Sequence, residues 1–169
     1  MSDESTNAGA VASTGEAAGA KPSPTVRIAG HFVRDLSFEN VAALEGTQAQ
    51  GTPEINVTVN LDAKEAGESR YQIAMKINAT AKIGDSTRFI VELDYVGIFE
   101  IANVPKEHLH PFLFIECPRQ ILPYARRVVS DVTRDGGYPP LMIENIDFAL
   151  LYRRRLDQLR AQQQNVQAN

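Results

Sequence analysis

The sequence lacks the features of disulfide-stabilised, membrane-spanning and secreted proteins. It has one cysteine, Cys117, so no disulfide can form within the chain. No apolar run reaches the ~18 residues that a membrane-spanning helix needs. The N-terminal residues MSDES are acidic where a secretory signal is basic, and no compact apolar stretch follows them. The sequence therefore predicts a cytoplasmic protein without direct membrane insertion.

Basic charge is also scarce. Lysine and arginine together number 17 against 21 aspartates and glutamates, which gives a net charge of −4. Nucleic acid is bound by a basic surface, so it is not an expected partner. An acidic protein suits a basic protein partner, or its charge serves solubility alone. The hydrophobic share of 43% is that of an ordinary globular domain.

The two ends of the chain differ in composition from its middle. Residues 1–25 are mainly alanine, glycine, serine and threonine, without the branched and aromatic side chains whose burial offsets the entropy cost of ordering. Residues 161–169, AQQQNVQAN, are similarly polar. We therefore expect a disordered N-terminal tail (1–25), one folded domain (26–160) and a flexible polar C-terminal tail (161–169).

Four segments show the alternation of apolar and polar residues that is typical of half-buried antiparallel strands. Residues 54–63 and 71–84 alternate in this way, and residues 86–102 follow after a Gly-Asp dipeptide that predicts a hairpin turn. An earlier strand is expected within residues 31–40. The link from it to the second strand is long for a hairpin, so we expect it to cross over. The predicted inward-facing residues are Leu36, Phe38, Ile55, Val57, Val59, Leu61, Tyr71, Ile73, Met75, Ile77, Ala79, Phe89, Val91, Leu93, Tyr95 and Phe99.

The pattern becomes helical after residue 102. Residues 104–116 form a short apolar segment with a proline suited to a first helical turn. Residues 122–137 predict a separate helix that starts near a proline and is ended by two glycines. Residues 147–164 predict an amphipathic final helix with Asp147 as its N-cap. Strands followed by helices indicate an α+β fold: a four-stranded antiparallel sheet with two main helices packed on one face.

Few residues are arranged for catalysis or metal binding. Cys117 lies beside a glutamate, whereas an activated thiol needs positively charged surroundings, so we interpret it as a small buried residue. His108 and His110 would point in different directions on a helix, and no third ligand is near in sequence. The sequence therefore predicts a protein that is not an enzyme and that uses no cofactor and no metal.

The polar side of the predicted sheet combines several carboxylates with a smaller number of basic and apolar side chains. Alternation also places apolar side chains of the last strand on this side, which favours a contact surface for a protein partner over a solvated face. The carboxylates on this side are Asp35, Glu39, Glu54, Asp62, Glu92 and Asp94. The basic residues with the same parity are Lys76, Lys82 and Arg88, and the apolar ones are Ile90, Val96 and Ile98.

Large apolar side chains are concentrated in the predicted helices and in the loop between them. Most are expected to fill the core against the sheet. The loop at residues 138–146 is rich in proline, and loops normally lie on the surface. Apolar loop residues beside an apolar helix face predict an open groove that accepts extended polypeptide.

Residues 116–152, ECPRQILPYARRVVSDVTRDGGYPPLMIENIDFALLY, resemble the signature of the SecB family of bacterial protein-export chaperones. The upstream segments RDLSFEN and YVGIF resemble the first and fourth strands of that family, so the resemblance covers about residues 26–160. It implies a homotetramer, a dimer of dimers, that binds unfolded precursor proteins without ATP and delivers them to the translocation ATPase SecA. It also implies that the chaperone has no catalytic activity.

The resemblance assigns roles to particular residues. The implied SecA-docking residues are Asp35, Glu39, Ile90 and Glu92. The implied groove for unfolded clients involves Leu44, Tyr138, Leu141, Ile143, Phe148, Leu151 and Tyr152. The positions implied in tetramer assembly are Val91, Leu93, Tyr95, Arg126 and Arg127.

A second interpretation stays open on the same fold. Some SecB-like chaperones serve other client systems, such as toxin–antitoxin pairs, without delivery to SecA. The acidic residues Asp35, Glu39 and Glu92 favour the export version, because they match the docking surface of the export chaperones.

Overall fold

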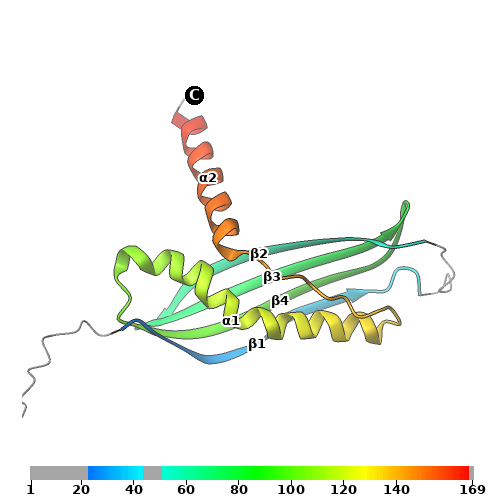
Figure 1. The fold of residues 1–169 in the computed structure, drawn as a ribbon, viewed down its shortest axis with the longest axis horizontal. Coiled ribbons are helices and arrows are strands. Elements are labelled where there is room, and N and C mark those ends of the chain that lie inside the picture. Colours follow the sequence, from blue (N-terminus) through cyan, green and yellow to red (C-terminus); the bar gives the residue numbers. More distant parts are fainter. Residues whose placement is uncertain (1–22, 44–50, 168–169) are drawn as a thin grey trace, which may run out of the picture.

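The computed structural model describes residues 23–43 and 51–167, and it has the predicted α+β architecture (Figure 1). Strands come first in the chain and helices follow. The strands are β1 (Thr25–Glu39), β2 (Glu54–Gly67), β3 (Arg70–Ile83) and β4 (Ser86–Ala102), and the helices are α1 (Lys106–Asp135) and α2 (Phe148–Gln167).

The strands form one antiparallel sheet in the order β1-β4-β3-β2. Because β1 and β2 lie at opposite edges, the link between them crosses over, as predicted. β3 and β4 form the predicted hairpin, in which Ile83 pairs with Ser86. Gly84 in its turn has a φ of +59°, a left-handed conformation that glycine adopts without steric cost.

The inward face of the sheet is the core, as the alternation predicted. On β3, Ile73, Met75 and Ile77 are fully buried, and on β4 the side chains of Val91 and Phe99 are too. On the two edge strands, β1 and β2, the inward-facing side chains are less completely buried. Leu36 of β1 and Ile55 of β2 were also predicted to face inward, but they remain 40% and 42% exposed.

The helical region differs from the prediction, because residues 104–116 and 122–137 do not form separate helices. They belong to one 30-residue helix, α1, with Pro111, Pro118 and Pro123 in its interior. Figure 1 shows α1 changing direction along its length, as expected where prolines remove backbone hydrogen bonds.

A row of buried side chains explains why the helix continues through its prolines. Neighbouring members stand four residues apart, so together they form one continuous ridge along α1. Burying one aliphatic side chain contributes roughly 1.5–3 kcal/mol, and an interior proline costs about 3 kcal/mol, so several such contacts offset the prolines. The row consists of Leu113, Cys117, Ile121, Ala125, Val129 and Thr133, each less than 9% exposed.

Helix α2 begins as predicted and ends later than predicted. The carboxylate of Asp147 accepts a hydrogen bond from the backbone N–H of Leu150 at 3.0 Å, which caps the helix start. The foot of α2 packs against α1 and the sheet, while the rest extends away from the body (Figure 1). The helix continues to Gln167, into the stretch predicted as a flexible tail. Neither α1 nor α2 is long and apolar enough to cross a membrane.

Parts of the domain prediction lie outside the described residues. Residues 1–22 of the predicted N-terminal tail and residues 168–169 of the C-terminal tail are among them, as is Leu44. Thr25, placed in the tail by composition, already belongs to β1. The disorder of the tails stays a prediction.

Candidate functional site

The outward face of the sheet brings four sequence-predicted residues together. In the pairing of β1 with β4, Glu39 lies opposite Ile90, Ser37 opposite Glu92, and Asp35 opposite Asp94. Directly opposed residues share a face of the sheet, so Asp35, Glu39, Ile90 and Glu92 form one surface, which we call the acidic patch. Its three carboxylate residues are exposed, and Ile90 is half-buried opposite Glu39 at one end of the patch.

The remaining carboxylates of this face are arranged differently. Asp94 accepts two hydrogen bonds from Arg34, from Nε at 3.0 Å and from Nη2 at 2.5 Å, so its charge is compensated locally. Glu54 lies on β2, at the far edge of the sheet, opposite Lys82. Asp62 is also on β2, two strands away from Glu92 on β4 and three away from Asp35 on β1. Of the carboxylates described on this face, those of Asp35, Glu39 and Glu92 therefore lie together on β1 and β4, with Lys76 of β3 beside Asp35 and Glu92.

One residue expected on this face lies elsewhere. Arg88 is only 6% exposed and lines a groove on the other side of the sheet edge. The pairing of β3 with β4 shifts register between Ala81 and Lys82, so Arg88 is the extra residue of a β-bulge. A bulge interrupts the alternation on which the prediction for Arg88 depended.

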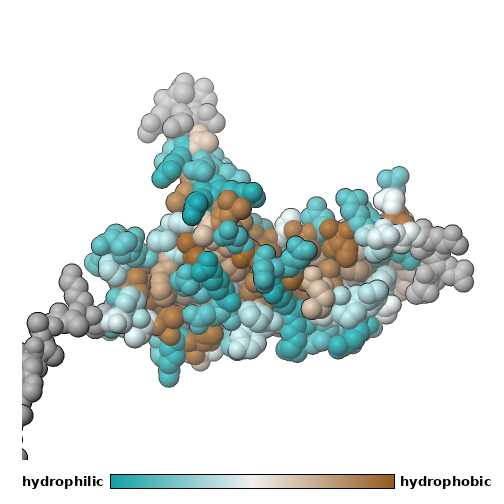
Figure 2. All heavy atoms as spheres, viewed as in Figure 1, coloured by the Kyte–Doolittle hydropathy of each residue, from teal (hydrophilic) through white to brown (hydrophobic). Residues whose placement is uncertain are grey.

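An apolar depression of about 390 Å³, the loop groove, lies between the hairpin end of the sheet and the loop after α1. The predicted residues Tyr138 and Leu141 line it, and Met142 is 74% exposed at its rim. Figure 2 shows apolar side chains gathered in this region of the surface. Its lining residues are Pro53, Ile55, Ala81, Ile83, Arg88, Phe89, Gly137, Tyr138, Pro139, Pro140, Leu141 and Met142.

A second depression of about 530 Å³, the foot groove, lies where α2 leaves the body. The predicted residues Leu151 and Tyr152 line it, together with Val59 and Leu61 of β2 and Phe114 of α1. The resemblance placed all the client residues in one groove, whereas the structure divides them between two. Phe148 is fully buried and Ile143 is 8% exposed, so both pack in the core and line neither groove.

The loop groove is tied together by hydrogen bonds that sequence reasoning missed. The Tyr138 hydroxyl donates to Asn40 Oδ1 at 2.7 Å and lies 3.0 Å from the carbonyl oxygen of Arg88. Asn40 Nδ2 in turn donates to the Gly136 carbonyl at 2.9 Å. These bonds join the end of β1 to the end of α1, and no periodicity in the sequence marks Asn40 as a member.

The foot of α2 is held by an aromatic and cationic cluster. The Arg155 guanidinium lies 4.8 Å from the centre of the Phe114 ring and donates to the Leu61 carbonyl at 2.6 Å. His110 Nδ1 lies 2.8 Å from the Tyr152 hydroxyl. His110 is thus part of a packing contact, and the described residues contain no group of three or more side chains suited to hold a metal.

Cys117 has the environment that the sequence predicted. It is fully buried in the row of α1 that faces the sheet. Burial, and to a smaller extent the neighbouring Glu116 carboxylate, raises the pKa of its thiol to about 12. A neutral buried thiol is a poor nucleophile, so Cys117 has a structural role.

The comparisons with known proteins decide the family. The family model described as preprotein translocase subunit SecB matches residues 19–159. The chain belongs to the SecB family. The resemblance drawn from residues 116–152 is thereby confirmed.

Its relatives in the SecB family are similar over most of their length. The protein-export protein SecB of Roseobacter denitrificans is 55% identical over 144 residues, which cover 83% of this chain and 87% of the relative. The protein-export protein SecB of Dinoroseobacter shibae is 50% identical, with 97% of this chain and 96% of the relative covered. These relatives support the identity of the chain as a SecB-type protein-export chaperone.

A solved structure supports the fold. A SecB-like chaperone of Mycobacterium tuberculosis, in complex with a peptide from the HigA1 antitoxin, matches with a TM-score of 0.57 and 18% sequence identity. The match covers 72% of this chain and 90% of that chain. At this identity the match carries the SecB fold alone.

The residues implied in SecB tetramer assembly differ in their burial: three lie in the core and two lie nearer the surface of α1. Val91, Leu93 and Tyr95 are less than 5% exposed in the core, so they can affect assembly only through the elements that cover them. Arg126 contacts the loop after α1, while Arg127 is exposed and pairs with Asp131 at 3.0 Å. The roles of these five residues in assembly stay predictions.

A small aromatic cluster extends from Tyr95 to the surface of the protomer. The Tyr95 hydroxyl lies 2.6 Å from Nδ1 of His31. The His31 ring in turn stacks on the Tyr124 ring at a centroid distance of 4.2 Å. Burial raises the pKa of the Tyr95 hydroxyl, an effect that the positive charge of Arg127 partly opposes. Tyr124 is 43% exposed, so this cluster links the buried Tyr95 of β4 to the solvent side of α1.

Proposed function

We propose that this SecB-family protein is an ATP-independent holdase that binds unfolded precursor proteins in the bacterial cytosol. The observation that carries the proposal is the loop groove, whose lining is mainly apolar and whose rim includes the exposed Met142. Unfolded chains expose apolar segments that a folded protein buries, so an open apolar groove distinguishes the two. Neither a cofactor nor a metal is needed for binding of this kind.

Weak contacts suffice for this activity if the protein is a homotetramer, as we propose. Four protomers present each groove four times, and one long client can occupy several grooves together. Linking of this kind raises avidity by ~10²–10⁴ without any new contact. Binding competes with client folding, so slowly folding precursors are retained and kept competent for translocation.

The holdase proposal is tested by refolding of a slowly folding precursor in the absence of ATP. We expect an excess of the tetramer to slow the appearance of folded precursor, measured by its fluorescence or protease resistance. Met142→Asp, which places a charge at the rim of the loop groove, should restore much of the refolding rate. Refolding at an unchanged rate with the wild-type protein would contradict the proposal.

We further propose that the acidic patch docks the SecA ATPase through a basic segment of that partner. Three exposed carboxylates share this face with one half-buried isoleucine, Ile90, which is a composition suited to a basic peptide with an apolar residue. The patch lies on the face of the sheet opposite to the core, away from both grooves. Client and SecA can therefore be bound together.

Charge reversal at Glu92 tests the docking role. Glu92→Lys should weaken SecA binding on the order of 10-fold or more, because a like charge then faces the basic segment. Glu54→Lys is the matched control, since Glu54 is an exposed carboxylate at the far edge of the sheet. Calorimetry with SecA and with an unfolded client peptide separates the two activities. Equal losses in both titrations count against a separate docking face.

The alternative of another client system remains a distinct outcome of these experiments. A chaperone that serves an antitoxin or another dedicated client would slow folding of that client and fail to bind SecA. Wild-type binding of SecA that depends on Glu92 therefore favours the export function.

A further inference from the structure

The loop between α1 and α2 runs back along α1 and is held there by one row of polar side chains. Arg126, Ser130 and Thr133 stand at i, i+4 and i+7, so they share one face of the helix. We call these three residues the polar row. Each contacts a different part of residues 141–145, in reverse order along the loop.

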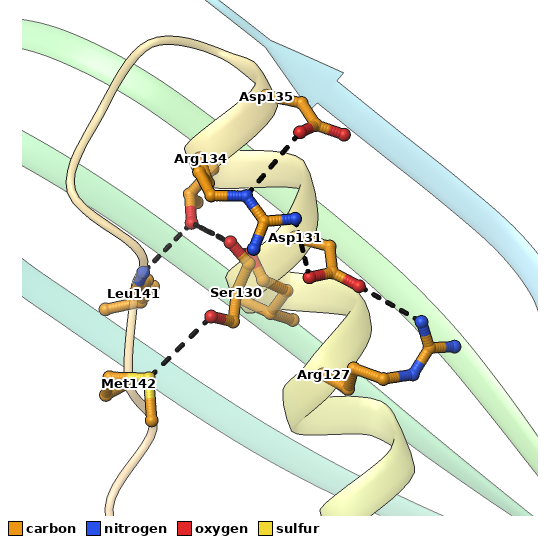
Figure 3. A network of polar contacts seen from close by, with 9 residues as sticks. Arg127, Ser130, Asp131, Arg134, Asp135, Leu141 and Met142 are labelled. Atoms are coloured by element: carbon orange, nitrogen blue, oxygen red, sulfur yellow. Dashed lines mark hydrogen bonds and ion pairs between the residues drawn. The ribbon is translucent and has the colours of Figure 1, made fainter.

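The contacts of the polar row are specific. Thr133 Oγ1 accepts a hydrogen bond from the backbone N–H of Leu141 at 2.9 Å, and Ser130 Oγ lies 3.7 Å from the sulfur of Met142. Figure 3 shows Leu141 and Met142 lying beside this face of α1, while Arg127 and Asp131 lie on the other side of the helix. Thr133 is fully buried, so its bond to the loop is protected from water.

Arg126 makes the last and most strongly charged of these contacts. Its Nη2 donates to the Glu144 carbonyl at 2.5 Å and to Asn145 Oδ1 at 2.9 Å. Hydrogen bonds from a charged donor are stronger than neutral ones. Residues 138–147 have no helix or strand of their own, so side-chain bonds of this kind, together with the burial of Leu141 and Ile143, hold the loop in place.

The outer side of the same loop is one wall of the loop groove. Pro139, Pro140, Leu141 and Met142 all line it. Leu141 and Met142 belong both to this wall and to the segment held on α1, so a shift of that segment away from α1 changes the width of the groove. We infer that Arg126, with the rest of the polar row, is a positioning residue that sets the shape of the client groove. This inference rests on the proposed client-binding function of the groove.

Arg127 provides a matched control for Arg126. It has the same chemistry and is adjacent in sequence, but it is exposed and forms its ion pair within α1, with Asp131, and not with the loop. Exposed ion pairs of this type contribute little to stability. A difference between variants at the two positions therefore reports the contact with the loop.

The inference is tested by the affinity of an unfolded, labelled apolar peptide for the full-length protein. Arg126→Ala should weaken peptide binding about 10-fold, whereas Arg127→Ala should leave it within about 2-fold. Arg126→Lys should recover part of the loss, because lysine retains a charged donor. Hydrogen exchange should show faster exchange of the Leu141 amide in Arg126→Ala but not in Arg127→Ala.

A double-mutant cycle separates positioning from a general structural effect. Asn145→Ala removes the side-chain acceptor on the loop and leaves the Glu144 carbonyl in place, so its effect on peptide affinity should be smaller than that of Arg126→Ala and largely absent when Arg126 is already alanine. Asn145→Ala combined with Arg127→Ala should be additive. If Arg126→Ala does not fold, two milder variants give the same comparison: Asn145→Ala at an exposed position and Arg126→Lys, which retains the charge.

Three outcomes overturn the inference. Unchanged peptide affinity in Arg126→Ala would show that the contact does not shape the groove. Loss of the tetramer by native mass spectrometry, with unchanged affinity per protomer, would make Arg126 an assembly residue instead. Failure of the wild-type protein itself to bind the peptide would remove the proposed function, a result distinct from equal binding by both proteins.

Discussion

Replacing Phe148 with alanine is expected to lower the free energy of unfolding by about 3–5 kcal/mol. Phe148 lies where α2 joins the core, and its side chain is fully buried, with 0% of its surface accessible to water. Its loss leaves a cavity beneath the first turn of α2 and weakens the attachment of that helix. Denaturant unfolding at a fixed protomer concentration measures the effect.

Leu150→Ala is the control for Phe148→Ala. Leu150 lies in the same helical turn but is 42% exposed, so its removal should change stability by no more than about 0.5 kcal/mol. The comparison also separates core packing from client contact. If Phe148→Ala weakened client binding while stability stayed unchanged, Phe148 would be a client residue and its assignment to the core would be wrong.

Replacing Gly97 with alanine is expected to destabilise the protein by about 1–3 kcal/mol. A β-carbon at this position of β4 would lie 2.7 Å from Cε2 of Phe99 and 2.9 Å from Cγ2 of Ile121. Both neighbours are fully buried, so neither can move aside without disturbing the contact between α1 and the sheet. Thermal or denaturant unfolding measures the loss.

Gly30→Ala is the matched control for Gly97→Ala. Gly30 also lies in a strand, β1, but a β-carbon there would meet no atom within 4 Å. Its replacement should be neutral or slightly stabilising, because alanine reduces the entropy of the unfolded chain. Similar losses in both variants would show that a β-carbon is disfavoured in the strands generally, and that close packing of α1 on β4 is not the cause.

The acidic patch shows which features of the sheet can be predicted from the alternation of side chains along a strand. Strand period alone places Asp35, Glu39 and Glu92 on the polar side of their strands, because successive side chains point to opposite faces. Period does not say which strands are neighbours. The order β1-β4-β3-β2 brings β1 beside β4 and leaves Glu54 and Asp62 at the far edge. Arg88 is the exception to the pattern, since the bulge in the β3–β4 pairing removes it from that face.

The two grooves could not be located from sequence in the same way. Their walls combine residues from β2, α1, α2 and the loop, which no local pattern relates to one another. Sequence resemblance identified Tyr138, Leu141, Leu151 and Tyr152, all of which line a groove. The resemblance could not distinguish these groove-lining residues from Phe148, which is buried in the core. A buried and a half-exposed apolar residue follow the same helical period.

The continuity of α1 is the clearest case in which local rules gave the wrong answer. Three prolines predict breaks, because each lacks a backbone donor and clashes with the preceding turn. The row of residues spaced by four from Leu113 to Thr133 was visible in the sequence. Its burial against the sheet, which outweighs the cost of the prolines, was not.

By itself, the sequence determined the strands and their inward faces, the α+β class, the buried state of Cys117 and membership of the SecB family. Each of these follows from local period, composition or a continuous motif. Only the tertiary structure decided that α1 is one helix, that four of the residues implied in client binding divide between two grooves, and that Arg126 contacts the loop. These depend on free energies of contact between residues far apart in the chain, and such contacts are settled when the sheet, the helices and the loop pack together.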